Sequence, residues 1–154
     1  MIHSIFDKQS KINSFDSLKY KNKPVIVFVY MNGCPYCDNM KPAWNSFKES
    51  NTISTIEVNH ELLNTLMTKD SSIFKPANSF PTIYSNRNVS YEGDRSTNSF
   101  LEFSKTVKKE DKKNKEDKKA KKSKDKDVKK SKSEDKKDKK KDKKPKDNKK
   151  DKKK

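Results

Sequence analysis

The stretch VIVFVYMNGCPYCDNMKPAW, residues 25–44, contains both cysteines of this 154-residue chain, Cys34 and Cys37. Its β-branched and aromatic residues up to Tyr30 predict a strand buried on both faces, in the centre of a sheet. The turn MNGCP follows, and Pro35 is typical of the first turn of a helix, where its missing N–H group costs nothing. We therefore expect the two cysteines to lie where a buried strand ends and a helix begins.

The charge of the chain divides it into two unlike parts. Nearly all of the formal net charge of +17 comes from residues 108–154, which carry 27 Lys against 12 Asp and Glu. Residues 1–107 carry 12 Lys and Arg against 10 Asp and Glu and contain all the aromatic side chains. The apolar residues of the second part are Ala120 and Val128, too few to offset the entropy of ordering it. We expect a folded domain over residues 1–107 and a disordered lysine-rich tail over residues 108–154.

Hydrophobic periodicity indicates the elements of the domain. Helices are expected over residues 11–20, 35–50 and 59–69, and from Ser96 onward. Strands are expected over residues 2–6, 22–30, 52–58, 82–85 and 89–93, of which the last two form a hairpin. This order of elements is that of an α/β domain.

The position of Cys34 favours a reactive thiol. A thiol at the first turn of a helix meets unpaired backbone N–H groups and the positive end of the helix dipole, and both stabilise the thiolate. Cys37 lies one turn further along the same helix, so a disulfide between the two can open and close without a change of fold. We expect Cys34 to attack a target disulfide and Cys37 to release the mixed disulfide.

Half of a metal site and a pair of idle thiols are the alternatives to a redox pair. Zinc needs four ligands, and the histidines of the chain, His3 and His60, are not at ligand spacing, so no metal site is expected. A purely structural disulfide would close too short a loop to restrain the unfolded chain. Idle thiols stay an alternative, although a CxxC between a strand and a helix is typical of redox motifs.

Residues 25–44 resemble the active-site region of the thioredoxin superfamily, and the order of elements matches that fold over most of residues 1–107. The string MKPAW at 40–44 is most similar to protein disulfide isomerase-type thioredoxin domains, with Pro42 where the family has its helix proline. YEGDRSTNSFLEF at 91–103 matches the last strand, the glycine and the closing helix. The resemblance implies a thioredoxin fold, with a central mixed sheet flanked by helices.

The resemblance also implies a substrate-binding surface. SFPTIY at 79–84 is similar to the segment with the cis-proline, here Pro81, and the backbone of Phe80 would bind a substrate segment. Tyr36 is expected to face solvent as a contact surface. The substrate-binding residues expected from the resemblance are Pro35, Tyr36, Phe80 and Pro81.

The four-residue motif CPYC is typical of glutaredoxins, but other positions depart from both groups. The glutathione-binding segments of glutaredoxins are replaced by Ser79-Phe80-Pro81 and Glu92-Gly93-Asp94. Relative to thioredoxins, Gly33 replaces the Trp before the first cysteine, and Phe28 replaces the buried carboxylate that would take a proton from the second. Glu57 is a candidate for part of that lost function.

We expect a thiol-disulfide oxidoreductase that exchanges disulfides with protein substrates as a monomer. The cycle needs neither a metal nor an organic cofactor, and either a reductase or glutathione would supply its electrons. The rival hypothesis is a thioredoxin-fold scaffold or structural protein that binds nucleic acid or another polyanion through residues 108–154. Such binding would be independent of sequence, because that segment has neither Arg nor aromatic residues to read bases.

Two features of the sequence bear on location. The first residues, MIHSIFDKQSKINSF, lack the pattern of a signal peptide. The longest apolar run, residues 24–31, is far short of the roughly 20 residues that cross a bilayer. We expect a cytoplasmic or nuclear protein, or a virion component if the source is a virus.

Overall fold

The computed structural model describes the backbone of residues 1–134 and the side chains of residues 1–116. Residues Met1–Lys115 form one compact unit and Glu116–Lys154 a second. The elements are β1 (His3–Phe6), α1 (Gln9–Ile12), a 3-10 helix η1 (Ser17–Tyr20), β2 (Val25–Tyr30), α2 (Pro35–Ser50), β3 (Ser54–Asn59), α3 (His60–Lys69), β4 (Thr82–Ser85) and α4 (Thr97–Glu134). None of the helices in this described part of the chain is long and apolar enough to cross a membrane.

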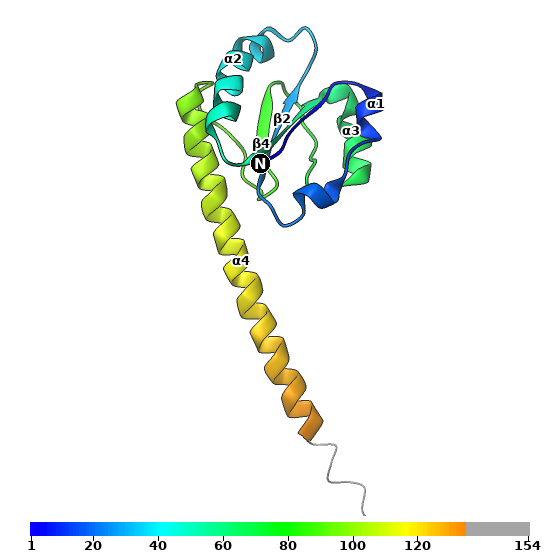
Figure 1. Ribbon diagram of the computed structural model, residues 1–154, viewed down its shortest axis with the longest axis vertical. Coiled ribbons are helices and arrows are strands. Elements are labelled where there is room, and N and C mark those ends of the chain that lie inside the picture. Colours follow the sequence, from blue (N-terminus) through cyan, green and yellow to red (C-terminus); the bar gives the residue numbers. More distant parts are fainter. Residues whose placement is uncertain (135–154) are drawn as a thin grey trace, which may run out of the picture. The chain divides into compact units, whose positions relative to one another are not determined.

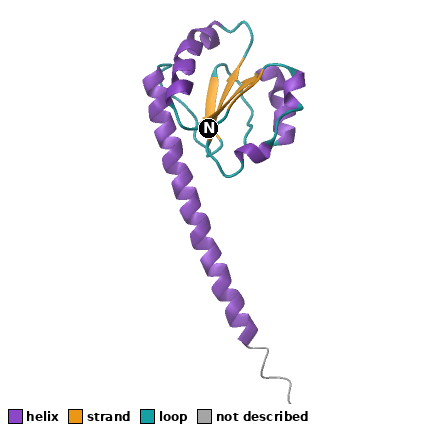
Figure 2. Ribbon diagram, in the orientation of Figure 1, coloured by secondary structure: helices purple, strands orange, loops and turns teal. Residues whose placement is uncertain are grey.

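The first unit is built on a four-stranded mixed sheet with the order β1-β3-β2-β4. β3 runs parallel to both of its neighbours, and β4 runs antiparallel to β2. Figure 2 shows the strands lying between helices. The expected α/β architecture, a central mixed sheet flanked by helices, is therefore confirmed.

β2 is buried along its whole length because both of its faces are covered (Figure 1). Val25, Val27 and Val29 belong to a core that includes Leu63 and Leu66 of α3. The alternate residues of β2 are Ile26, Phe28 and Tyr30. They belong to a second core, which also includes residues of α2 and of the first turns of α4. The continuous apolar run in the sequence thus supplies two cores from one strand.

Trp44 of α2 lies at the centre of the second core. Its ring centroid is 5.2 Å from that of Phe28, 5.1 Å from that of Phe47 and 5.5 Å from that of Phe100. Aromatic pairs at such distances contribute about 0.5–1.5 kcal/mol each beyond the burial of their area. These contacts hold α2 and the start of α4 over β2, and α2 carries the cysteines.

The single helix expected over residues 11–20 is wrong, because the structure has α1 and η1 there. The carboxylate of Asp16 accepts a hydrogen bond from the backbone N–H of Leu18 at 2.9 Å and so caps a new helical turn. Ile12 is fully buried, whereas Leu18 is 69% exposed. The apolar spacing of this segment therefore does not mark one continuous buried face.

The expected strand at residues 89–93 is also wrong in extent. The segment forms only an isolated bridge between Tyr84 and Ser90, with hydrogen bonds from Ser85 N to Val89 O at 2.8 Å and from Tyr91 N to Ile83 O at 3.0 Å. Beyond it the hydroxyl of Tyr91 donates to the carbonyl of Asp94. The backbone therefore turns before a longer ladder can form.

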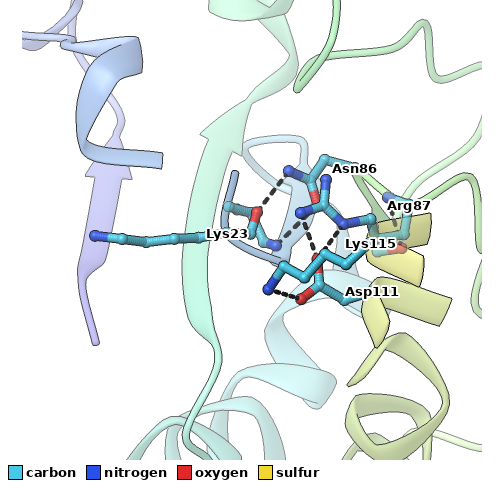
Figure 3. Close-up of polar contacts among 7 residues, drawn as sticks. Lys23, Asn86, Arg87, Asp111 and Lys115 are labelled. Atoms are coloured by element: carbon cyan, nitrogen blue, oxygen red, sulfur yellow. Dashed lines mark hydrogen bonds and ion pairs between the residues drawn. The ribbon is translucent and has the colours of Figure 1, made fainter. Parts of the chain in front are cut away.

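The domain continues past residue 107, where we expected the disordered tail to begin. Asp111 is 6% exposed, and its carboxylate accepts hydrogen bonds from Arg87 Nε at 2.7 Å and from Lys115 Nζ at 2.6 Å (Figure 3). Arg87 lies in the loop after β4, so the ion pair fastens α4 to the sheet. Residues 108–115 therefore belong to the domain, and the compact unit ends at Lys115.

The residue types of α4 beyond this ion pair explain why its backbone is helical there. Lys, Glu and Ala are good helix formers, and neither Gly nor Pro occurs between residues 97 and 134. The expected disorder of residues 135–154 lies outside the described part of the chain.

The surroundings of Asp111 set its ionisation. Burial alone would raise the pKa of its carboxyl group, but the hydrogen bonds from Lys115 and Arg87 and the charges of both outweigh burial and hold that pKa below its usual range. The carboxylate therefore stabilises the folded domain above its pKa in the unfolded chain, about 3.9. That contribution is lost as the pH falls through the lower pKa of the folded state.

Replacing Asp111 tests this attachment. Asp111→Asn should lower the free energy of unfolding by about 1–3 kcal/mol at neutral pH, because Arg87 loses its charged partner. The matched control is Glu102→Gln, which removes the exposed partner of Lys105 and should cost less than about 1 kcal/mol.

The measurement is chemical denaturation of the full chain at several pH values. The difference between the wild-type protein and Asp111→Asn should shrink below about pH 4. A difference that stays constant down to pH 2 would mean that the Asp111 charge does not stabilise the fold.

Candidate active site

Cys34 lies just beyond the C-terminal end of β2. The chain leaves Tyr30 and turns through Gly33, whose φ of +71° is in the left-handed region that favours glycine. Cys34 is then the N-cap residue of α2, with Pro35 as the first helical residue. The expected helix from Pro35 to Ser50 is confirmed.

Cys34 and Cys37 are both free thiols, and both are buried. The sulfur of Cys34 accepts a hydrogen bond from the backbone N–H of Cys37, with an Sγ–N distance of 3.3 Å. Cys34 is 4% exposed and Cys37 is fully buried. The sulfur of Cys34 therefore takes the capping place that Ser or Asp occupies in other helices.

The pKa values of the two thiols move in opposite directions. The hydrogen bond from the Cys37 thiol lowers the pKa of Cys34, and the backbone N–H groups of Cys37 and Tyr36 lower it further against the opposing effect of burial. Burial raises the pKa of Cys37 to about 11, and its interaction with Cys34 adds to that rise. Of the two thiols, Cys34 is therefore the one that ionises more readily.

The loop before β4 brings Phe80 against Cys34. β4 runs antiparallel to β2, so its first residue Thr82 lies beside Val29, near the end of β2. The thiol of Cys34 donates to the carbonyl oxygen of Phe80, with an Sγ–O distance of 3.7 Å. The peptide bond between Phe80 and Pro81 is cis. Of the residues expected to bind substrate, Phe80 is therefore in direct contact with the cysteine expected to attack.

Tyr36 lies on the surface beside the cysteines, with 63% of its side chain area exposed. The guanidinium carbon of Arg95, in the loop before α4, is 5.2 Å from the centroid of its ring. Sequence reasoning missed this partner, because 58 residues separate the two and no motif links them.

His60 is a second residue that sequence reasoning missed. It is the first residue of α3 and follows directly on β3, whose last residue Asn59 pairs with Tyr30 of β2. Its ring centroid is 5.0 Å from that of Phe80. The expected strand at 52–58 followed by a helix already places this position at the same edge as the cysteines, so topology was the available signal.

Among the described residues, Asp38 is the carboxylate that acts on the Cys37 thiol, and neither Phe28 nor Glu57 supplies one. Phe28 packs against Trp44 in the core. Glu57, the candidate from the sequence, is paired with Lys48 at 2.5 Å. The charged groups that act on the Cys37 thiol are Cys34 and Asp38, so the suggested role of Glu57 is not supported. Within the described residues, no group of three or more His, Cys, Asp or Glu side chains could hold a metal ion.

Comparisons with known proteins give matches among solved structures only; no family model and no curated protein matches the chain. The J-Trx1 fragment of ERdj5 matches with a TM-score of 0.52 and 26% sequence identity, over 69% of this chain and 52% of that one. This chain thus spans about half the length of that fragment.

Two further matches are more distant. The first thioredoxin domain of mouse protein disulfide-isomerase A4 has a TM-score of 0.48 at 17% identity, over 68% of this chain and 73% of that domain. A thioredoxin pre-protein of Schistosoma mansoni has a TM-score of 0.46 at 19% identity, over 71% of this chain and 98% of that one. The domain has a thioredoxin fold, and its cysteines have the CxxC spacing.

The hydrogen bond between the thiols predicts a specific response to mutation. In the reduced full chain, iodoacetamide should modify Cys34 before Cys37, with a pH midpoint below the ordinary thiol pKa of about 8.5. Cys37→Ala should raise that midpoint because the thiol donor is gone. Cys37→Ser keeps an O–H donor and should stay closer to the wild-type midpoint. Mass spectrometry of quenched samples measures both rates, and an unchanged midpoint in Cys37→Ala would rule out this cause.

Proposed function

We propose that this protein is a thiol-disulfide oxidoreductase that exchanges disulfides with protein substrates. The proposal rests on one observation: Cys34 caps the start of α2, and its sulfur accepts a hydrogen bond from the backbone N–H of the fully buried Cys37. This arrangement agrees with a lowered pKa for Cys34 and a pKa raised to about 11 for Cys37. A nucleophilic thiolate beside a protonated thiol is the arrangement that a two-step exchange requires.

In the first step the Cys34 thiolate attacks a sulfur of the substrate disulfide. A bond forms between Cys34 Sγ and that sulfur, the substrate S–S bond breaks, and the other substrate sulfur leaves with the electron pair and takes a proton from water. The Phe80 carbonyl accepts from Cys34 only while that residue is a thiol. Once Cys34 is a thiolate, the carbonyl is free to accept a backbone N–H of the substrate.

In the second step Cys37 loses its proton and attacks Cys34 Sγ. The Cys34–Cys37 disulfide forms, and the substrate thiolate leaves, so two electrons have passed to the substrate. The interaction with Cys34 that raises the pKa of Cys37 disappears when Cys34 enters the mixed disulfide. Cys37 therefore becomes easier to deprotonate at the step that uses it, and a reductase or glutathione then restores the dithiol.

The remaining expected site residues surround this chemistry. Pro35 starts the helix that presents Cys34, and Tyr36 is exposed beside it. The carbonyl oxygen of Phe80 lies 3.7 Å from Cys34 Sγ, and Pro81 follows Phe80 in the chain. We assign these four residues to the binding of the substrate segment.

Insulin reduction by dithiothreitol tests the proposal. The full chain should accelerate the precipitation of reduced insulin, and Cys34→Ser should reduce that acceleration to the background rate because it removes the nucleophile. Cys37→Ser should also lose turnover but should accumulate a mixed disulfide that mass spectrometry detects. A wild-type protein no faster than Cys34→Ser would show that the pair is not a working redox centre.

The charge of the C-terminal part favours an additional polyanion-binding function. Residues 116–154 follow the compact domain and contain most of the 27 lysines found after residue 107. The full chain should bind duplex DNA of any sequence, with an affinity that falls steeply as salt rises. A chain that ends at Lys115 keeps the Asp111 ion pair and should not bind. Equal binding by both chains would place the site elsewhere.

A further inference from the structure

Arg95 presents a guanidinium group next to the CPYC motif. Its guanidinium carbon lies 5.2 Å from the centroid of the Tyr36 ring, and both side chains are exposed. A cation over an aromatic face is held there by the ring quadrupole, at about 0.5–1 kcal/mol for an exposed site. Tyr36 therefore restricts the orientation of the Arg95 side chain.

Arg95 has no ion-pair partner among the described residues. The other arginine, Arg87, is engaged by Asp111, and Lys41 of α2 is paired with Asp38 at 2.7 Å. The carboxylate next to Arg95 in the sequence, that of Asp94, instead accepts from Ser96 N at 3.0 Å and from Ser96 Oγ at 2.6 Å. Within the part of the chain whose side chains are described, the positive charge of Arg95 is thus uncompensated.

The contact with Tyr36 leaves the N–H donors of the Arg95 guanidinium available for a carboxylate. The five N–H donors of a guanidinium lie in its plane and match the two oxygens of a carboxylate. The contact with the Tyr36 ring is made over the ring face and supplies no carboxylate to those donors. The group is therefore oriented and still free to bind a carboxylate from outside the chain.

The surface around Arg95 suits a protein segment rather than a small polar thiol. Met31 and Tyr36 lie on either side of Cys34 in the sequence and are two of the few large apolar side chains exposed on the described part of the chain, at 37% and 63%. An extended peptide can cover these side chains, whereas glutathione has no apolar side chain to place on them. Tyr36, which contacts Arg95, and Met31, whose carbonyl oxygen is 3.4 Å from Cys34 N, thus flank the candidate nucleophile along the chain.

We propose that Arg95, held by Tyr36, is a specificity-determining residue that selects protein segments with an acidic side chain beside the reacting cysteine. This inference rests on the proposed function and adds a substrate class to it. Arg95 binds the carboxylate of the segment while Cys34 attacks its sulfur. The preference adds to the rate of the first exchange step and does not depend on Cys37.

The test measures that first step alone. Two peptides are compared that differ only in Glu against Gln next to a cysteine activated as a 2-thiopyridyl disulfide, and glutathione activated in the same way is the third probe. The full chain carries Cys37→Ser, so each molecule reacts once. Cys34 sulfur bonds to the peptide sulfur, the peptide–pyridyl S–S bond breaks, and pyridine-2-thione leaves with the electron pair and is followed by its absorbance.

The ratio of the Glu-peptide rate to the Gln-peptide rate is the quantity of interest, since a changed reactivity of Cys34 cancels in it. With Arg95 present the ratio should be roughly two- to five-fold at low salt, the range of an exposed ion pair. Arg95→Gln should bring it to about one, and Arg95→Glu below one. Lys41→Gln removes the same charge from a residue that is already paired, so it should leave the ratio unchanged. Molar salt should bring the ratio to about one in every variant.

Each result decides between the two proposals. A ratio that falls with Arg95→Gln and persists in Lys41→Gln supports the assignment. A ratio near one in the unaltered Arg95 protein, or one that Lys41→Gln also removes, overturns it while leaving the oxidoreductase proposal in place. An effect of Arg95→Gln on the glutathione probe alone overturns the assignment to protein segments. Failure of Cys34 to react with any probe overturns both.

Discussion

The burial of β2 on both faces is the constraint from which the site follows. A strand covered on one side by α3 and on the other by α2 and α4 has to lie in the interior of the sheet, with β3 and β4 as its neighbours. Its end is then fixed relative to the ends of both neighbours. The turn after Tyr30 consequently places Cys34 against Phe80, which lies in the loop before β4. His60, which follows β3, also lies near Phe80.

The chemistry of the cysteines arises from how differently the two sulfurs are surrounded. Cys34 accepts hydrogen bonds as the cap of α2, and Cys37 is buried one turn further on. One environment favours the charged form and the other opposes it, and each thiol strengthens the effect on its partner. The two environments therefore distinguish the thiols, and Cys34 is the one that ionises more readily.

Helix α4 continues across residue 107, where the composition divides the chain into an apolar part and a lysine-rich part. Charge counts divided the chain at residue 107, after which the apolar residues are only Ala120 and Val128. The structural domain extends to Lys115, because Asp111 lies against Arg87 from the loop after β4. A carboxylate in a lysine-rich segment has no distinctive local pattern, and only the folded loop shows which aspartate is buried.

Local sequence determined the elements that carry the cysteine pair. The apolar run of β2, the CPYC turn with Pro35 at the helix start, and the Asn59 cap of α3 are each readable from neighbouring residues, because strand burial and helix capping are local effects. Failures occurred at residues 11–20 and 89–93, where side chains such as Asp16 and Tyr91 turn the backbone by contacts that periodicity does not describe.

Tertiary structure alone decided which distant residues meet at that site. The thioredoxin resemblance indicated Phe80, but the contacts of His60 with Phe80 and of Arg95 with Tyr36 join segments that share no motif. The same holds for Glu57, whose pairing with Lys48 removes it from the chemistry suggested for it. Helices and strands follow from neighbours along the chain, whereas electrostatic partners follow from where the sheet and its loops bring charges together.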